Sequence, residues 1–426
     1  MSSACVTLVS AMALFLAPAA AQNASDAEAV RVRSHPKFQQ ALAALDADHD
    51  RLVREIIALT EIPAPPFAED ARGEAYLQML RAHGLSDVGR DAEGNVMGLR
   101  RGHGGGPLIA IAAHLDTVFP AGTDVTVKRD GTRLAAPGIG DNTRSLAVLL
   151  AMLRAMDAAG IRTSADLLFI GDVGEEGLGD LRGMKYLFQK GPYKDRIDMF
   201  ISMDGAGAGD DITRGGVGSK RYRVTFKGPG GHSYGAFGLV SPAFAMGLAI
   251  AKFSDVTVPT SPKTTFNVGV VGGGTSVNSI PFESWMEVDM RSESPAELAK
   301  LEATFQRLMR EAAAEENRLR STRQGAIEAD LQLVGDRPSG ETPLDSRLVQ
   351  AAAAAVRAAG MQPTFGYSST DSNIPISLGI PAITIDSGGR GGRAHALDEW
   401  IDVEKTSSLR GIESALTLVL TLAGID

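Results

Sequence analysis

The chain has 426 residues, of which 44% are hydrophobic and 22% charged, values typical of a soluble globular protein with room for two hydrophobic cores. Its formal net charge of -9 argues against a nucleic-acid partner, because no basic stripe is present to neutralise phosphates. The only cysteine is Cys5, near the amino terminus. A chain from which an amino-terminal segment containing Cys5 has been cleaved holds no thiol or disulfide. Any metal ion in such a chain must be bound by nitrogen and oxygen atoms.

The amino terminus has the pattern of an export signal. Residues 6–18 form an apolar stretch that is too short to span a bilayer comfortably, and the small residues 19–21 precede Gln22. We therefore expect a signal peptide at residues 1–21, export to the bacterial periplasm, and no stable membrane span after cleavage.

Apolar periodicity predicts alternating helices and strands in the first half of the chain. Helical spacing covers residues 38–60, 74–83 and 146–159, and strands are predicted at residues 95–99, 107–113, 165–171 and 199–203. The run at residues 107–113 carries no charge, which is typical of a central strand in a parallel sheet that is covered on both faces. This part of the chain therefore predicts an α/β domain.

The pattern changes after residue 214. Strands at residues 220–227, 265–271, 284–290 and 327–334, with helices at 239–253 and 296–319, follow in the order β-α-β-β-α-β. Beyond them a helix at 348–359, a strand at 382–385 and a helix from about residue 403 resume the α/β pattern. We therefore expect a catalytic domain with a central, mostly parallel sheet, formed by residues 22–214 and 331–426, and an inserted α+β ferredoxin-like domain at residues 215–330.

Polar side chains follow the predicted strands at the edge where parallel strands carry their chemistry. The candidate metal or catalytic residues are His114, Asp141, Glu175, Glu176, Asp204 and His395. Two imidazoles and several carboxylates meet the needs of two divalent ions that share one ligand. Of two adjacent glutamates in a loop, one can bind a metal ion while the other acts as a base. Asp116 lies two residues beyond His114 and can orient its ring.

Taken together and in order, six motifs resemble the M20 family of dinuclear zinc peptidases and amidohydrolases, which includes peptidase T, dipeptidases, carboxypeptidases and acylases. The motifs are His114-Leu-Asp116, Gly140-Asp141-Asn142, Glu175-Glu176-Gly, Asp204-Gly, Gly230-Gly-His232 and Ala394-His395, and they cover essentially the whole mature chain. The resemblance implies two divalent metal ions, for which zinc is expected and manganese or cobalt are the alternatives. Their implied ligands are His114, Asp141 and Asp204 for one ion, and Asp141, Glu176 and His395 for the other, with Asp141 as the bridge.

The resemblance also implies roles for further residues. Glu175 would be the general base and acid, and the inserted domain would be a lid that also forms a homodimer. His232 of this lid would donate a hydrogen bond to the oxyanion, often at the site of the neighbouring subunit. Arg291 would bind a substrate carboxylate, for which a planar guanidinium is suited, and Asn278 would help to hold the substrate. Asn142 stands where the family often has a second aspartate, joined to the bridging one by a cis peptide bond.

Three functions are compatible with these motifs. Aspartate at position 204 resembles the aminopeptidase and dipeptidase branches, so we expect a hydrolase that cleaves short peptides with a two-metal activated water. An N-acyl-amino-acid amidohydrolase or a glutamate-type carboxypeptidase would use the same residues. A catalytically inactive binding relative is the third alternative, and the complete ligand set together with Glu175 argues against it.

Overall fold

The computed structural model describes residues 24–426, so the predicted signal peptide and Cys5 lie outside the described residues. Among the helices of residues 24–426, none combines the length and apolar character that a bilayer span requires. The chain divides into two units: unit 1 comprises the residues up to Gly215 together with Glu341–Asp426, and unit 2 is Gly216–Gly340.

Unit 1 is built on a nine-stranded mixed sheet in the order β1-β2-β6-β3-β7-β17-β8-β15, with β16 paired to β8. Its strands are β1 (Ser86–Arg90), β2 (Val96–Arg100), β3 (Leu108–His114), β6 (Asp166–Asp172), β7 (Met199–Met203), β8 (Asp211–Gly216), β15 (Gly340–Glu341), β16 (Thr364–Ser368) and β17 (Ala382–Ile385). The four central strands β6, β3, β7 and β17 are parallel, so their carboxyl ends meet at one edge. The predicted α/β class with a mostly parallel central sheet is therefore confirmed.

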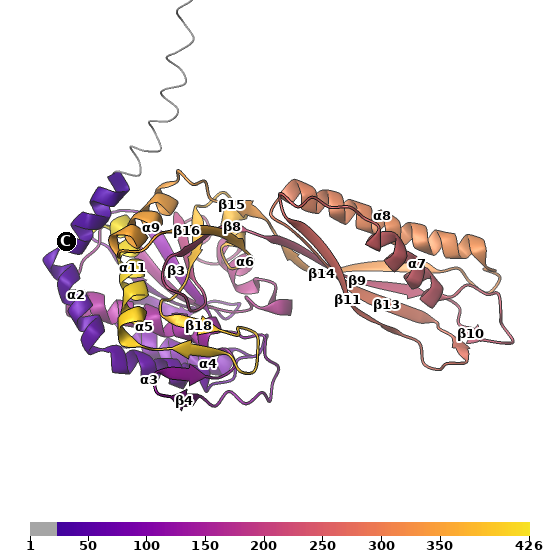
Figure 1. The fold of residues 1–426 in the computed structure, drawn as a ribbon, viewed down its shortest axis with the longest axis horizontal. Coiled ribbons are helices and arrows are strands. Elements are labelled where there is room, and N and C mark those ends of the chain that lie inside the picture. Colours follow the sequence, from indigo (N-terminus) through magenta and orange to yellow (C-terminus); the bar gives the residue numbers. More distant parts are fainter. Residues whose placement is uncertain (1–23) are drawn as a thin grey trace, which may run out of the picture. The chain divides into compact units, whose positions relative to one another are not determined.

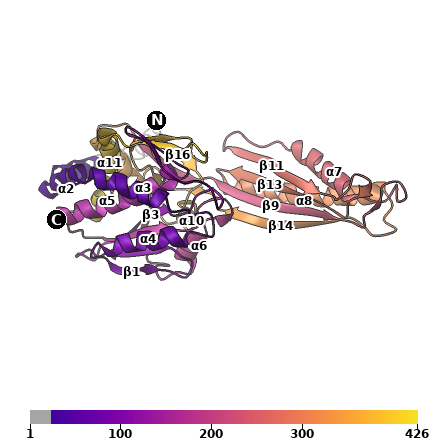
Figure 2. The ribbon, with the colours of Figure 1, turned by 90° about the horizontal axis from the view of Figure 1, so that it is seen from below.

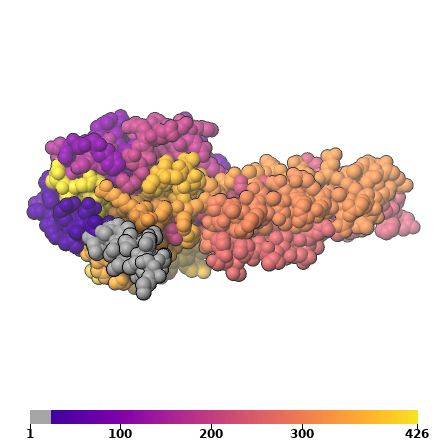
Figure 3. Space-filling model, turned by 90° about the horizontal axis from the view of Figure 1, so that it is seen from above, coloured from indigo at the N-terminus to yellow at the C-terminus, as the bar shows by residue number. Residues whose placement is uncertain are grey.

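Helices cover both faces of this sheet. They are α2 (Pro36–Ala47), α3 (His49–Thr60), α4 (Asp70–Arg81), α5 (Arg144–Ala158), α6 (Arg182–Gln189), α9 (Arg347–Ala358), α10 (Asn373–Ser377) and α11 (Lys405–Ala423), and a helix at residues 24–34 precedes them. Alternate residues of β3 face different cores: Ile109 and Ile111 pack in the core that contains α5, and Ala110 and Ala112 in the core that contains α6 and α10. Figure 1 shows α2, α5, α9 and α11 grouped on one side of unit 1. In Figure 3 the indigo and yellow surfaces adjoin, because α2 contacts α11.

The single helical segment expected at residues 38–60 is two helices. Asp48 separates α2 from α3, and its backbone leaves the helical region at φ -93° and ψ 2°. Its carboxylate accepts a hydrogen bond from Nε of Arg154 on α5. The apolar periodicity continues across the break because both helices pack on the same core.

A second, four-stranded sheet of unit 1 lies in the order β18-β19-β5-β4. Its strands are β4 (Lys128–Asp130), β5 (Arg133–Ala135), β18 (Arg390–Gly392) and β19 (Trp400–Asp402). The loop between β18 and β19 contains His395, and β5 leads into the turn η1 (Ile139–Thr143), which contains Asp141. This sheet therefore brings together two segments that are distant in the sequence.

Unit 2 has a four-stranded antiparallel sheet in the order β11-β13-β9-β14, which Figure 2 shows. Its strands are β9 (Gly218–Lys227), β11 (Thr264–Gly273), β13 (Glu283–Ser292) and β14 (Glu328–Arg337), with a short pair formed by β10 (Gly231–His232) and β12 (Ser279–Ile280). The helices α7 (Pro242–Ser254) and α8 (Pro295–Leu319) lie on one face of the sheet, as Figure 1 shows. The main elements follow the predicted β-α-β-β-α-β order. The unit ends later than residue 330 because β14 pairs with β9 as far as Arg337.

Candidate active site

Five candidate ligands of unit 1 converge at the carboxyl edge of the parallel strands. Nε2 of His114, at the end of β3, lies 2.9 Å from Oδ1 of Asp141, and Oδ2 of Asp141 lies 3.1 Å from Nε2 of His395. Oε1 of Glu176 lies 2.9 Å from the same atom of His395, and Oδ1 of Asp204 lies 3.6 Å from Nε2 of His114. Asp141 thus presents one oxygen to each imidazole, which is the arrangement that a bridging carboxylate requires.

This donor set fits a divalent cation. One ligand atom each from His114, Asp141 and Glu176 lies within 4.8 Å of the others. Burial lowers the pKa of His114, but the carboxylates of Asp141 and Asp204 outweigh burial and hold the pKa well above its usual range. The carboxylates of Asp141 and Glu176 raise the pKa of His395 to about 10. The site thus combines nitrogen and oxygen donors with concentrated negative charge, which favours a bound cation. A cation that binds to these donors must displace protons from the two imidazoles.

Asp116 fixes the loop that contains the two glutamates. Its Oδ1 accepts a hydrogen bond from the N–H of Glu175 (3.0 Å), and its Oδ2 accepts one from the N–H of Glu176 (2.9 Å). From the sequence we expected this carboxylate to orient His114. The hydrogen-bond partner of Nδ1 of His114 is instead the main-chain carbonyl of Asp116, at 3.0 Å, and the carboxylate oxygen lies 3.7 Å away. Asp116 therefore contacts the ring through its main chain, and its carboxylate positions Glu175 and Glu176.

Asn142 connects the turn of Asp141 with the loop of Asp204, and the peptide bond between Asp141 and Asn142 is cis. The Asn142 side chain is buried, its Nδ2 donates to the carbonyl of Met203 (2.9 Å), and its Oδ1 accepts from the N–H of Gly205 (3.3 Å). These partners stand on either side of Asp204, so one amide fixes the main chain around that ligand. A carboxylate at this position could accept from Gly205 but, when ionised, could not donate to Met203.

Replacing Asn142 by aspartate should lower Tm and weaken metal binding. Leaving a buried polar group without its partner costs about 1–3 kcal/mol, and disturbing a residue that orients a ligand typically costs about 10–100-fold in metal affinity. Asn317 of unit 2 offers a matched control, because it donates to the carbonyl of Ile327 (3.0 Å) and accepts from its N–H (2.8 Å). The N317D variant should lose stability without losing zinc affinity. Thermal melts and zinc titrations measure both quantities, and equal zinc affinity in the two variants would contradict the role of Asn142.

Sequence reasoning missed Glu399, which is buried beside the turn of Asp141. Its Oε1 accepts hydrogen bonds from the N–H groups of Gly140 (2.7 Å) and Asp141 (2.9 Å), and its Oε2 accepts one from the N–H of Gly138 (3.0 Å). Burial raises the pKa of Glu399 to about 7, although these amides lower it. Glu399 and Asp141 are 258 residues apart, and the partners are main-chain groups, so no residue pattern in the sequence marks this contact.

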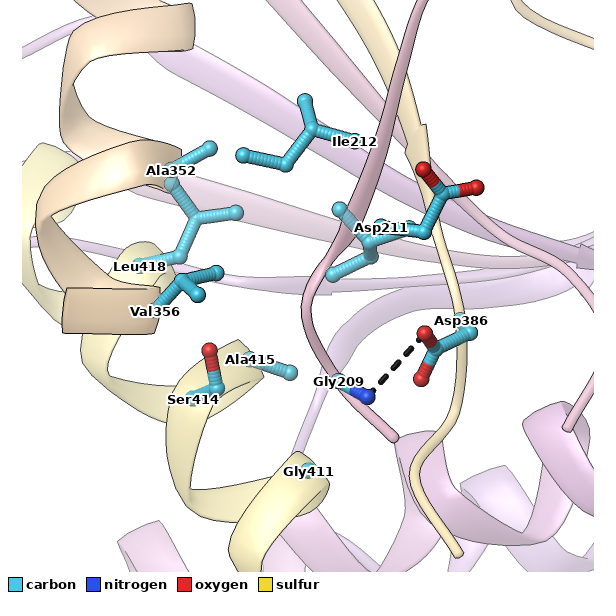
Figure 4. A pocket seen from close by; sticks show the side chains of 11 residues that line it. Gly209, Asp211, Ile212, Ala352, Val356, Asp386, Gly411, Ser414, Ala415 and Leu418 are labelled. Atoms are coloured by element: carbon cyan, nitrogen blue, oxygen red, sulfur yellow. Dashed lines mark hydrogen bonds between the residues drawn. The ribbon is translucent and has the colours of Figure 1, made fainter. Parts of the chain in front are cut away.

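Asp386, which directly follows β17, connects two further loops. Its Oδ2 accepts from the N–H of Gly209 (3.0 Å), a contact drawn in Figure 4, and its Oδ1 accepts from the N–H of Gly388 (3.0 Å). The cavity beside it has a volume of about 10 Å³, is lined by side chains of α9 and α11, and has room for about one water molecule. Asp386 therefore joins its own loop, between β17 and β18, to the loop after Asp204, and the cavity is too small for a substrate.

A pair of buried carboxyl groups lies near the predicted base. Asp172 ends β6 opposite His114, and both Asp172 and Asp371 are buried. Burial raises the pKa of Asp172 to about 7 and, together with the charges of Asp172 and Glu175, raises that of Asp371 well above its usual range. Two neighbouring buried carboxyl groups resist ionising together, because their negative charges repel each other. No role for Asp172 was predicted from the sequence.

Unit 2 brings together His232 and Asn278. The N–H of Ser233 donates to the carbonyl of Asn278 (2.9 Å), and β10 pairs with β12 next to it. Nδ1 of the exposed His232 ring accepts hydrogen bonds from the N–H groups of Tyr234 (3.2 Å) and Gly235 (3.3 Å). Because Nδ1 is an acceptor, the neutral ring carries its hydrogen on Nε2 and is a hydrogen-bond donor there.

Arg291 lies near the end of β13 in unit 2. Its Nε donates to Oδ2 of Asp289 at 2.7 Å, and the same carboxylate accepts from Ser219 (2.9 Å) and Arg221 (3.2 Å). Asp289 therefore holds the Arg291 side chain in place, and a carboxylate ligand would be bound through the Nη groups.

Comparisons with known proteins agree with this fold. Aminopeptidase PepT from Bacillus cereus matches with 20% identity and a TM-score of 0.70, over 88% of this chain and 98% of its own. The dipeptidase Dug1p from Saccharomyces cerevisiae matches with 14% identity and a TM-score of 0.71, over 90% and 98%. The YxeP protein from Bacillus subtilis, described as a dinuclear metal-binding peptidase of the M20 family, matches with 18% identity and a TM-score of 0.65, over 88% and 98%.

No curated protein sequence matches the chain. The profile of peptidase family M20/M25/M40 matches residues 110–421, which is more than half of the chain and includes every candidate ligand. The chain therefore belongs to peptidase family M20/M25/M40.

Proposed function

We propose that this family member hydrolyses the peptide bonds of short peptides, with Glu175 as the general base. The reaction would use two divalent ions, for which zinc is the first choice. The observation that carries the proposal is the position of Asp141, whose two carboxylate oxygens lie 2.9 Å from His114 and 3.1 Å from His395. Glu176 and Asp204 complete a separate set of ligands on each side. Such a set can hold two ions that share one carboxylate.

The reaction follows from this placement of groups. Two divalent ions, when bound, supply Lewis acidity that activates a water molecule and polarises the scissile carbonyl. Glu175 accepts a proton from the attacking water and then delivers it to the departing amine. Its main chain is fixed by Asp116, and the residue as a whole is only 5% exposed, so its carboxylate is shielded from most solvent.

Unit 2 supplies the groups that bind the rest of the substrate in this proposal. His232 donates from Nε2 to the oxyanion, which agrees with the bonds that its Nδ1 accepts. Removing a donor of this kind costs about 10²–10³-fold in turnover. Arg291 binds a substrate carboxylate, and Asn278 helps to hold the substrate beside His232.

The proposal is tested by offering dipeptides, tripeptides and N-acetyl amino acids to the zinc-loaded protein. We expect peptides with a free amino group to be cleaved, and N-acetylation of the same peptide to lower kcat/KM at least about tenfold, because a polar group of the site loses its partner. Preferred cleavage of N-acetyl amino acids would identify an amidohydrolase instead. Binding of two ions without hydrolysis of any of these substrates would favour the inactive binding relative.

We also propose that unit 2 forms a homodimer through β11. This outer strand of the sheet, Thr264–Gly273, carries no charge and no proline, whereas β14 at the opposite edge carries Glu328, Asp330 and Asp336. Uncharged edge strands pair readily with other chains. Light scattering of the purified protein decides between a dimer and a monomer. Export to the periplasm is a further proposal, which rests on residues 1–21 alone.

A further inference from the structure

Glu399 and His395 lie in the same hairpin. The strands β18 and β19 pair in antiparallel fashion, and the loop between them contains both residues. On its other side β19 pairs with β5, where Trp400 lies opposite Ala135. Since β5 leads into the turn of Asp141, this register places Glu399 directly beside that turn.

The contact between hairpin and turn is close and specific. Glu399 is 2% exposed, and its carboxylate accepts hydrogen bonds from three main-chain N–H groups, at 2.7, 2.9 and 3.0 Å. A Cβ atom on Gly140 would lie 3.1 Å from Oε1 of Glu399, so a larger residue there would push that oxygen back by a few tenths of an ångström. The main-chain carbonyl of Glu399 also accepts from the N–H of Ala136 at 3.0 Å.

We infer that Glu399 is a positioning residue that fixes Asp141 relative to His395, so that these two ligands of the second ion keep their mutual arrangement. This inference rests on the proposed two-metal function. The hydrogen bond to the N–H of Asp141 fixes the peptide plane from which the bridging carboxylate projects. The hairpin, in turn, fixes Glu399 relative to His395. Residues that orient metal ligands in this way are needed for full affinity, although they do not touch the ion.

Only a carboxylate satisfies all three N–H groups. Its two oxygens accept every bond and offer no hydrogen of their own. A glutamine keeps the size of the side chain but directs an NH₂ group at one or more of the same donors. The E399Q variant therefore disturbs the turn of Asp141 with the smallest change in volume.

The test is zinc affinity and stoichiometry, measured by competition with a chromophoric chelator on metal-free protein. We expect E399Q to bind zinc about 10–100-fold more weakly than the wild type, with the larger loss at the second equivalent. Glu404 provides the matched control, because its carboxylate accepts from the main-chain N–H groups of Thr406 (2.9 Å) and Ser407 (2.8 Å) at the start of α11. The E404Q variant should keep wild-type zinc affinity.

A second variant approaches the same contact from the other side. In G140A the new methyl group would press against Oε1 of Glu399 and against Ile401, whose Cγ2 would lie 3.2 Å from it. Zinc affinity should fall as in E399Q, although Glu399 is retained. Circular dichroism of the metal-free variants shows whether each is folded. If E399Q is not folded, the zinc affinity of G140A decides the test.

The outcomes separate the inference from the proposed function. A wild-type protein that does not bind two zinc ions overturns the proposed function and this inference with it. Two ions in the wild type, with unchanged affinity in a folded E399Q or G140A, overturn the inference alone. An equal loss in E404Q also overturns it, because the effect would then not depend on contact with Asp141.

Discussion

Replacing Glu175 by glutamine should lower kcat by about 10²–10⁴-fold, the usual contribution of a general acid–base group, while zinc stays bound. The glutamine keeps the size of the side chain and the main-chain hydrogen bond to Asp116, but it cannot accept a proton from water. Steady-state kinetics on a cleaved peptide, with metal content measured on the same preparation, give both quantities.

The control for this variant is E55Q. Glu55 is likewise a buried glutamate of unit 1, but on α3, where it binds Arg51 (2.9 Å) and Arg154 (2.8 Å). Its replacement should cost stability and leave kcat unchanged. Turnover above a tenth of the wild-type value in E175Q, with both ions bound, would remove Glu175 from the role of base.

Replacing Asp141 by alanine should have the largest effect of any single ligand. It removes a carboxylate that contacts both His114 and His395, so each of the two proposed ions would lose a ligand. We expect less than about one tightly bound ion per chain, because a shared ligand supports both sites. Hydrolysis should fall at least ~10³-fold, since Lewis-acid activation is worth several kcal/mol and each 1.36 kcal/mol is a factor of ten.

The comparison that tests Asp141 is with D204A. Oδ1 of Asp204 lies 3.6 Å from Nε2 of His114, so Asp204 is placed to bind the ion on that side of the site. Its loss should therefore weaken the binding of one ion more than that of the other. Metal content after dialysis against a weak chelator distinguishes the two variants. Two tightly bound ions in D141A would show that Asp141 is not the bridge.

The fold could be predicted where apolar patterns are strong. All of β3 is buried, and its uncharged sequence predicted a central strand within one residue of each observed end. The helix α6 was missed: it has only eight residues, it contains Gly183, and the left-handed conformations of Asp180 and Leu181 precede it. The strands β4, β5, β18 and β19 have three residues each, which is too few for periodicity to be recognised.

The candidate site could be predicted where the chemistry lies in the residue type. Histidines and carboxylates at strand ends can be recognised in the sequence as candidate ligands. In the structure, His114 is paired with Asp141, and His395 is paired with both Asp141 and Glu176, within hydrogen-bond distance. The supporting contacts could not be predicted. The carboxylate of Glu399 and the amide of Asn142 act on main-chain groups, which every residue has, so only the folded chain shows which groups they reach.

The insertion point of unit 2 explains how one fold can carry two separable parts. The chain leaves unit 1 after β8 and returns at β15, and these strands are neighbours in the sheet. The two ends of the inserted segment are therefore close together, as at the sites where domain insertion is tolerated. Because each unit has its own hydrophobic core, the inserted unit can change in length or sequence without altering the strand order of the sheet that holds the metal ligands. Substrate range can then diversify in one part of the chain while the hydrolytic chemistry stays in the other.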